Sequence, residues 1–459
     1  MEWKISLLSG RFLFGWVWMV LYMLDSGIVV VNAFGTIQSR LKYQQDTRLF
    51  VLSQEENGEE NNGMMMNRRS VMIKSGLLST SLVMGLPQIN YAVEDEEDTR
   101  MFASWSAVDG LNSELEGVVT FDPSAYKAMK EDSSRTPLFK QAIIDRLYSS
   151  SSSKSPESQI VLDLGTGPYA LFAIIAAEAG AGKVYAVEAN PEAARLARAL
   201  VTKLGFNDVI TILEGFSTDI PSLPNNDKAD FCVAEIIGSI ATEEGAYATI
   251  RDAQRFLKDP SSPQNWIPSR IQTYAAPASY TLHNLFGPPE FDWSKLNGTP
   301  VRFSCRDEGL QLLSEPQLVE DVSFANLGSS TTNNKTPFTF IMDETKMEAN
   351  QGALEQEFQM GKLSKSEAME RAKDTSHSVS GIAFWPRLIL SDSIIVNSRQ
   401  YPNGNHQRSH WQTVLPIMSN RPIGNLKTGD SIQVNFDFIT PESVSKPPKY
   451  TVSGKVIRK

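Results

Sequence analysis

The feature that most constrains the fold is an apolar strand, a glycine turn and an apolar helix pattern in direct succession. Val161 to Leu164 predicts a short buried strand, and Gly165-Thr166-Gly167-Pro168-Tyr169-Ala170 follows it. The apolar pattern of Leu171 to Ala179 predicts a helix. Glycines let the backbone approach a ligand closely, and the N-terminus of a helix offers free N–H groups. This succession predicts a nucleotide-type site.

More strands of the same kind follow. Lys183 to Val187, Val209 to Leu213 and Asp230 to Glu235 are short apolar runs that predict strands. Between the first two lies a helix pattern that Asn190 caps and Gly205 ends. Strands that alternate with helices predict an α/β domain with a parallel sheet.

The type of ligand is indicated by two acidic residues beside the glycine turn. Glu188, at the end of the second strand, can bridge ribose hydroxyls in either a nicotinamide or an S-adenosylmethionine site. Asp163 lies two residues before Gly165 and favours S-adenosylmethionine, because a carboxylate there orients the glycine loop near the cation of that cofactor. We therefore expect Asp163, Gly165, Gly167 and Glu188 to form an S-adenosyl-L-methionine site. A purely structural strand, turn and helix is the alternative.

A pair of glutamates follows the fourth strand. Glu235 ends that strand, Gly238 follows three residues later, and Glu244 lies nine residues after Glu235. This pattern resembles the double-glutamate loop of the protein arginine N-methyltransferase family. The segments Ala253-Gln254-Arg255-Phe256-Leu257-Lys258-Asp259 and Ile267-Pro268 are similar to its symmetric-dimethylating branch. The pair His410-Trp411 is instead similar to the asymmetric and monomethylating branches, so the type of product stays open.

The chemistry of arginine agrees with this resemblance. A guanidinium is planar and always charged, so two carboxylates can hold it by charge-assisted bidentate hydrogen bonds. The resemblance implies that Glu235 and Glu244 are catalytic, with Glu243 as a rival for the second role. The alternative is a pair of solvated loop glutamates.

The segment Tyr126 to Thr136 resembles the helix that covers the cofactor in this family. The resemblance implies that Arg135 clamps the methionine carboxylate, that Met129 packs beside the methyl group, and that Asp132 pairs with a histidine of the catalytic loop. Taken alone, the segment is equally well interpreted as a solvent-facing helix.

That histidine is His410, because Ser409-His410-Trp411-Gln412 resembles the Thr-His-Trp loop of the family. The resemblance implies that His410 helps to remove the released proton and that Trp411 forms a wall of the arginine channel. A turn histidine beside a packing tryptophan is the alternative.

Two positions depart from the family pattern. Ser409 replaces the threonine, and Thr218 stands where the family often has a glutamate, so we expect Phe216 or Ser217 to contact the adenine instead.

After Ile267-Pro268 the sequence changes to short β-rich runs broken by Pro, Gly and Asn, which predict a barrel or sandwich. The predicted strands are Ile271 to Ala275, Phe338 to Met342, Gly381 to Phe384, Leu388 to Leu390, Gln412 to Ile417, Ser431 to Ile439 and Tyr450 to Val456. The resemblance implies a β-barrel domain at 268–459 after a Rossmann-like class I methyltransferase domain at 93–267. It also implies a dimerisation arm at 279–299 and hence a homodimer. The charged stretch 347–373 predicts a solvated helix or flexible insertion, with a binding arm as the alternative.

The first 92 residues read as targeting segments. Phe12 to Leu24 is an apolar run behind Lys4 and Arg11, which predicts a signal peptide over 1–33, with a membrane anchor as the alternative. The Val31-Asn32-Ala33-Phe34 junction resembles that of proteins sent to complex algal plastids. In 34–92, Arg68-Arg69 before a mildly apolar stretch is similar to a twin-arginine signal. We expect a plastid location, with the thylakoid lumen as the final compartment, or alternatively the secretory pathway.

Composition excludes other classes. The net charge of −10 makes nucleic acid an unsuitable partner and a basic, arginine-containing protein a suitable one. Two cysteines are too few for a Cys-rich zinc site or a disulfide framework, and no metal spacing is present. The sequence thus predicts an arginine methyltransferase. The alternatives are a methyltransferase for another nucleophile and a catalytically weak cofactor-binding scaffold.

Overall fold

The computed structural model describes residues 5–12, 15–24, 27–33, 99–107, 123–149, 154–305, 310–329, 337–399, 409–439 and 448–459. Three antiparallel strands near the N-terminus form a sheet of their own: β1 (Ile5–Phe12), β2 (Gly15–Leu24) and β3 (Gly27–Ala33). The predicted segment 34–92, with its paired arginines, lies outside the described residues.

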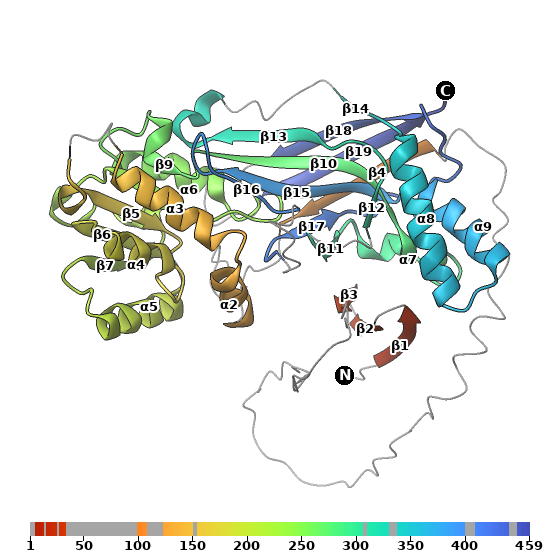
Figure 1. The fold of residues 1–459 in the computed structure, drawn as a ribbon, viewed down its shortest axis with the longest axis horizontal. Helices are drawn as coiled ribbons and strands as arrows, with labels where there is room; N and C mark the ends of the chain where they lie inside the picture. Colours follow the sequence, from red (N-terminus) through yellow and green to blue (C-terminus); the bar gives the residue numbers. More distant parts are fainter. Residues whose placement is uncertain are drawn as a thin grey trace, which may run out of the picture.

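A five-stranded parallel sheet forms the first large unit (Figure 1). Its order is β7-β6-β5-β8-β9, from β5 (Ile160–Leu164), β6 (Lys183–Glu188), β7 (Ile210–Glu214), β8 (Phe231–Ala234) and β9 (Trp266–Ile267). The helices of this unit are α2 (Pro123–Glu131), α3 (Thr136–Leu147), α4 (Leu171–Glu178), α5 (Pro191–Leu204) and α6 (Ala246–Ala253). The central strands are buried on both faces, which is why they read as unbroken apolar runs. The Rossmann-like α/β prediction is confirmed.

Local signals set the ends of α5. The side chain of Asn190 accepts hydrogen bonds from the backbone N–H groups of Glu192 and Ala193. Gly205 ends the helix with φ of 78°, a left-handed conformation that glycine adopts at little cost. Glu188 ends β6 just before the Asn190 cap, at the carboxyl edge of the sheet.

The second unit consists of two antiparallel sheets. The larger sheet has the path β11-β17-β15-β10-β12, with β13 paired to β10 and β16 paired to β15. Its strands are β10 (Arg270–Tyr280), β11 (Val301–Ser304), β12 (Leu310–Leu312), β13 (Gln317–Ser323), β15 (Gly381–Ile389), β16 (Ile395–Asn397) and β17 (Gln412–Leu415). The smaller sheet has the order β14-β18-β19-β4, from β4 (Arg100–Ser106), β14 (Phe338–Ile341), β18 (Ser431–Ile439) and β19 (Lys449–Ile457).

Aromatic side chains from both sheets share one core. Trp105 of β4 stacks on Tyr450 of β19 at 5.5 Å between ring centroids, and Phe384 of β15 lies 4.9 Å from Phe436 of β18. Burial of such large rings contributes about 2–3 kcal/mol each. The two sheets close around this core as the predicted β-barrel domain.

Short 3-10 helices connect these elements. They lie at Pro156–Ser158, Ser217–Asp219, Pro224–Asn226, Gln254–Phe256, Pro263–Asn265, Trp293–Leu296 and Phe324–Ser329. No helix among the described residues is long and apolar enough to cross a membrane.

The first domain was predicted to start at residue 93, and the strand β4 corrects this boundary. β4 pairs along its length with β19, so residues 100–106 belong to the smaller sheet of the barrel. The alternating burial of β4 is typical of a strand, but the local sequence does not indicate that the strand pairs with β19.

Two predicted strands, Gly381 to Phe384 and Leu388 to Leu390, are a single strand, β15. Pro386 lacks an N–H donor and therefore predicts a break. The strand nevertheless continues through it, pairing Pro386 with Thr273 of β10, and the carbonyl of Pro386 accepts a hydrogen bond from the Ser398 hydroxyl.

The charged stretch 347–373 lies in a helical hairpin, so the helix of the prediction is confirmed, and a few of its residues are buried. The hairpin comprises α8 (Glu344–Met360) and α9 (Lys365–Ser376), and Ser364 begins α9 with a capping box. Its buried residues form a small core with Leu285: Leu354, Phe358, Ala368 and Ala372. In Figure 1 the hairpin lies at the end of the barrel strands opposite the parallel sheet.

The predicted arm at 279–299 is compact. It contains the end of β10, the short helix α7 (Thr281–Leu285) and the 3-10 helix at Trp293–Leu296. Trp293 and His283 are buried here, with their rings 5.1 Å apart.

Candidate active site

A cavity of about 400 Å³ lies at the carboxyl ends of the parallel strands. Ligands of open α/β sheets bind at this edge, and the volume falls in the range of small-molecule sites. It is lined by these predicted site residues: Met129, Arg135, Gly165, Gly167, Glu188, Phe216, Ser217, Glu235, Glu244, His410 and Trp411. The predicted cofactor residue Asp163 and the predicted catalytic residue Asp132 lie behind the lining.

The glycine turn has the backbone conformation that requires glycine. Gly165 and Gly167 have φ of 73° and 64°. A Cβ at Gly165 would also lie 2.7 Å from the Ile236 side chain, just after Glu235. Gly165 is therefore the point at which the glycine turn touches the double-glutamate loop, the name used below for residues 235–244.

Asp163 holds the turn from behind. Its Oδ2 accepts hydrogen bonds from the Thr166 hydroxyl at 2.5 Å and from the Ala173 N–H at 3.0 Å. Burial raises the pKa of Asp163 to about 7, against the lowering effect of these two hydrogen bonds. Asp163 thus connects the turn to the start of α4, and it does not line the cavity.

Glu188 connects the turn to the next helix. Its two carboxylate oxygens accept hydrogen bonds from the N–H groups of Gly167 and Asn190, both at 2.8 Å. Burial raises the pKa of Glu188, while these N–H groups lower it. The carboxylate retains acceptor capacity for a ribose hydroxyl at the cavity wall.

The buried Ser217 hydroxyl and the buried Nε of Arg135, both in residues of the cavity wall, have no hydrogen-bond partner among the described residues. Buried polar groups of this kind are normally satisfied, so each indicates a ligand. Ser217 lies at the end where adenine is expected and Arg135 at the end where a methionine carboxylate is expected. The lining residues therefore fit S-adenosylmethionine.

Arg135 also binds the first glutamate. Its Nη2 donates to Glu235 in an ion pair that is almost completely buried, and its Nη1 donates to the Met129 carbonyl at 2.8 Å. The guanidinium carbon lies over the rings of Phe139 and Phe172, 5.6 and 5.0 Å from their centroids. Arg135 is therefore rigidly held between the cofactor end of the cavity and the double-glutamate loop.

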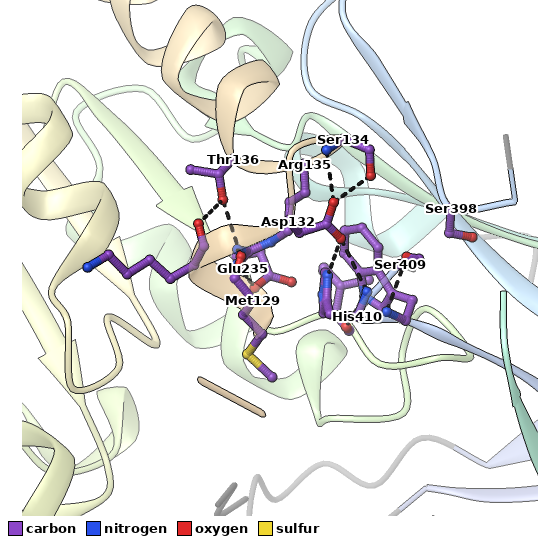
Figure 2. A network of polar contacts seen from close by, with 12 residues as sticks. Met129, Asp132, Ser134, Arg135, Thr136, Glu235, Ser398, Ser409 and His410 are labelled. Carbon is purple, nitrogen blue, oxygen red and sulfur yellow. Dashed lines mark hydrogen bonds and ion pairs between the residues drawn. The ribbon is translucent and has the colours of Figure 1, made fainter. Parts of the chain in front are cut away.

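Asp132 and His410 come together although 278 residues separate them (Figure 2). Nδ1 of His410 lies 2.9 Å from Asp132 Oδ2, and Ser134 donates to Oδ1 of the same carboxylate. Burial alone would raise the pKa of Asp132, but the hydrogen bonds from His410 and Ser134 bring it below its ordinary value. Burial lowers the pKa of His410, which Asp132 only partly offsets. We therefore assign an ionised Asp132 and a neutral imidazole whose Nε2 can accept a proton.

The second glutamate, Glu244, makes no hydrogen bond or ion pair with the described residues, whereas Glu243 pairs with Arg302 of β11. Burial and the neighbouring Glu235 and Glu243 raise the pKa of Glu244 to about 8. A carboxyl in this state ionises readily when a cation arrives.

The double-glutamate loop is fixed by the barrel domain. The indole N–H of Trp411 donates to the Ile237 carbonyl at 2.8 Å, and the backbone N–H of Gln412 donates to the Ser239 hydroxyl at 3.1 Å. Trp411 is thus part of the cavity wall through its ring and an anchor of the loop through its nitrogen.

A second anchor lies below the loop. The Thr273 hydroxyl accepts the N–H of Ala241 at 2.9 Å and donates to Glu320, which also accepts the Thr242 hydroxyl at 2.5 Å. Burial raises the pKa of Glu320, against the lowering effect of these hydroxyls.

Sequence reasoning missed Arg302, Thr273 and Glu320. Arg302 and Glu320 lie on strands β11 and β13, which were not predicted, and Thr273 read only as a strand residue. No short motif marks them, because their partners lie on other strands. In β11 the alternation of apolar and polar residues indicates that Arg302 and Phe303 lie on opposite faces of the strand.

Cys232 and Cys305 are both buried free thiols. Among the described residues there is no cluster of His, Cys, Asp or Glu that could hold a metal ion.

Comparison with known proteins agrees with this geometry. Residues 106–263 match the family model described as PRMT5 arginine-N-methyltransferase. The chain is 29% identical over 184 residues to protein arginine N-methyltransferase 5 of Oryza sativa subsp. indica, covering 38% of this chain and 27% of that protein. It is 29% identical over 230 residues to protein arginine N-methyltransferase 7 of Gallus gallus, covering 49% of this chain and 31% of that protein. The matches thus span about a third or less of these relatives.

Among solved structures, that of Arabidopsis thaliana protein arginine methyltransferase 10 is similar at a TM-score of 0.49 and 18% identity. The similarity covers 73% of this chain and 98% of that one.

Proposed function

We propose that the chain, which belongs to the protein arginine N-methyltransferase family through residues 106–263, transfers methyl groups to guanidinium nitrogens of arginine in a protein substrate. One observation carries the proposal: Glu235 and Glu244 line the same cavity as the glycine turn and Arg135. A carboxylate pair beside a cofactor site fits a planar cation whose nitrogen must face an electrophile.

The cofactor we propose is S-adenosyl-L-methionine, which supplies an electrophilic methyl group on a sulfonium. Gly165 and Gly167 would bring the backbone against it, and Glu188 would accept its ribose hydroxyls. Ser217 would contact the adenine, and Nε of Arg135 would donate to the carboxylate of the methionine part.

The residues of the chain would orient the substrate and remove its proton. Arg135 holds Oε2 of Glu235, which leaves Oε1 for the guanidinium. Glu244 would ionise against the same guanidinium and localise its positive charge, so that the nitrogen facing the methyl group is the better nucleophile. Once that nitrogen has gained the methyl group it loses a proton, and the neutral Nε2 of His410 is the acceptor we propose.

The test is incubation of the full chain with isotope-labelled S-adenosylmethionine and an arginine-rich protein, followed by mass spectrometry of modified residues. Label on arginine, absent with Glu235→Gln, is the expected result, and the spectrum gives the number of methyl groups. Label on another residue type, retained by Glu235→Gln, would show a methyltransferase for another nucleophile. Cofactor binding without label would show a scaffold.

We also propose that residues 1–92 direct the protein to a plastid, with the thylakoid lumen as its destination. The support is the apolar run before the Val31-Asn32-Ala33-Phe34 junction and the Arg68-Arg69 pair. A fluorescent fusion of residues 1–92, expressed in an alga with a complex plastid, tests this. Arg68→Lys with Arg69→Lys should stop the fusion in the stroma. Secretion of the fusion would favour the secretory pathway.

A homodimer is proposed from the family resemblance of the segment 279–299. Light scattering of the full chain behind a sizing column gives the mass directly. A mass of 50.9 kDa at micromolar concentration would contradict the dimer.

A further inference from the structure

The cavity contains an arginine that the proposed reaction does not use. Arg302 comes from β11 and lines the cavity together with Glu235, Glu243 and Glu244. Its guanidinium forms a two-pronged ion pair with Glu243: Nη2 bonds to Oε1, and Nη1 lies 3.3 Å from Oε2. The exposed fractions of the two side chains are only 17% and 8%, so water screens the pair little.

Glu243 is also held by its own loop. Its Oε2 accepts hydrogen bonds from the N–H groups of Ser239 at 3.2 Å and Ile240 at 3.4 Å. A Cβ on Gly238 would lie 2.6 Å from the Cβ of Glu243, so only glycine lets the loop fold back this closely. Glu243 therefore has both oxygens engaged and cannot hold a second guanidinium in the same way without releasing Arg302.

The neighbouring Glu244 differs from Glu243 because its carboxylate is not engaged by the described residues. It has no hydrogen bond or ion pair with the described residues and lies against the same space as Glu235. The three carboxylates of the double-glutamate loop would offer an incoming arginine more than one way to bind, and only one of these ways is aligned for reaction. The positive charge of Arg302 pairs with Glu243, so this carboxylate does not compete for the incoming arginine.

We propose that Arg302 is a specificity-determining positioning residue: by occupying Glu243, it leaves Glu244 as the partner of Glu235 and limits the cavity to one substrate guanidinium. This inference rests on the proposed arginine chemistry. It assigns no chemical step to Arg302, which acts through Glu243.

The test is a double-mutant cycle of wild type, Arg302→Met, Glu243→Gln and the double variant, all in the full chain. An arginine-containing peptide is titrated by calorimetry in the presence of S-adenosylhomocysteine, and kcat and KM are measured with S-adenosylmethionine. Arg270→Met with Asp321→Asn, a half-exposed ion pair on the barrel outside the cavity lining, is the matched control and should change neither measurement. Circular dichroism melts verify that every variant folds.

Arg302→Met frees Glu243, so the peptide should bind as tightly as to wild type or more tightly, while kcat falls about tenfold through unproductive pairing. Glu243→Gln removes the carboxylate that pairs with Arg302 and leaves a positive charge facing the incoming guanidinium, so peptide affinity should fall about tenfold. The double variant removes both charges and should return to within about threefold of wild type in both measurements.

The pH dependence of kcat/KM provides a second measurement. Burial, Glu235 and Glu243 raise the pKa of Glu244, whereas Arg302 and Arg135 lower it. The pH at which kcat/KM rises should therefore be higher in Arg302→Met than in wild type and lower in Glu243→Gln. In the double variant it should return to the wild-type value. A purely structural ion pair would lower activity without this opposed shift.

Multiplicative losses in the double variant, or a parallel fall of affinity and kcat in Arg302→Met, would overturn the inference. So would the failure of all four proteins to bind the peptide, because the inference requires a guanidinium site. If wild type binds the peptide but transfers no methyl group to arginine, the proposed function fails while the binding cycle still decides the role of Arg302.

Discussion

The glycine turn and the double-glutamate loop form two halves of the same cavity. The residues that hold the glycine turn lie near it in the sequence, whereas the residues that hold the loop lie far from it. Asp163, Thr166 and Glu188 fix the glycine turn from within a short stretch of the parallel sheet. The double-glutamate loop is instead held by Thr273, Glu320 and Trp411 of the barrel. The first half is a local structure, whereas the second also depends on contacts with the barrel.

Because of this difference, we expect cofactor binding and turnover to respond to different substitutions. Substitutions around the glycine turn should weaken cofactor binding, whereas substitutions in the barrel should lower turnover and leave cofactor affinity unchanged. The proposed activity can therefore be dissected by measuring cofactor Kd and kcat for the same set of variants.

The largest effect is expected from Glu235→Gln, which removes the charge that both Arg135 and the substrate use. We expect kcat to fall about 100- to 1000-fold, because a preorganised charge at the reacting group is lost. Cofactor Kd should change little. Glu192→Gln, in an exposed ion pair with Arg195, is the control and should leave kcat unchanged. A loss of cofactor binding equal to the loss of kcat would place Glu235 in the cofactor half.

His410→Asn should lower kcat by about 100-fold, because a general base contributes about that much. Burial keeps the pKa of His410 below its ordinary value, so the neutral imidazole is present above that pKa and is lost as pH falls through it. Glu244 must also lose a proton, with a pKa of about 8. In wild type, log kcat/KM should therefore rise with pH with a slope of about two at the acid end, and in His410→Asn with a slope of about one.

For that comparison His377→Asn is the control, since His377 lies at the end of α9 and outside the cavity lining. An unchanged acid slope in His410→Asn would contradict a proton-accepting role.

Gly165→Ala tests the glycine turn. A left-handed φ of 73° and a contact of 2.7 Å with Ile236 both oppose a methyl group, so we expect cofactor Kd to rise about 5- to 100-fold. Gly205→Ala has a similar φ of 78° but no heavy atom within 4 Å of the new Cβ. It should cost about 1 kcal/mol of stability and leave Kd unchanged. Equal effects of both variants on Kd would mean that backbone strain, and not the contact with Ile236, dominates.

The smallest effect is expected from Thr273→Val, which removes the hydroxyl between Ala241 and Glu320 and keeps the shape of the side chain. The free energy of unfolding should fall by about 1–3 kcal/mol, because a buried N–H and a buried carboxyl lose a partner. We expect kcat to fall a few-fold at unchanged cofactor Kd. Thr451→Val, whose hydroxyl contacts Ser104 on the half-buried face of the smaller sheet, should leave kcat unchanged. A rise in cofactor Kd in Thr273→Val would show that the two halves are coupled.

The same contrast explains what could be predicted from sequence. The strand, glycine turn and caps of the first domain were predictable, because periodicity, Asn190 and Gly205 act over a few residues. The pairing of β4 with β19 was not, since a strand pattern does not name its partner. The two strands predicted on either side of Pro386 form the single strand β15, although a proline usually ends a strand.

The candidate site follows this rule as well. Glu235 and Glu244 were found because their spacing forms a recognisable pattern within ten residues. The choice between Glu243 and Glu244 stayed open, because it depends on Arg302, which reaches the loop from another domain.

The position of β4 has a consequence for how the molecule matures. β4 pairs with β19, and Ser104 bonds to the carbonyl of Tyr450 across 346 residues of chain. Synthesis is vectorial, so β4 leaves the ribosome long before its partner exists. The barrel can therefore close only after β19 has emerged, so its completion follows the synthesis of the whole stretch between β4 and β19.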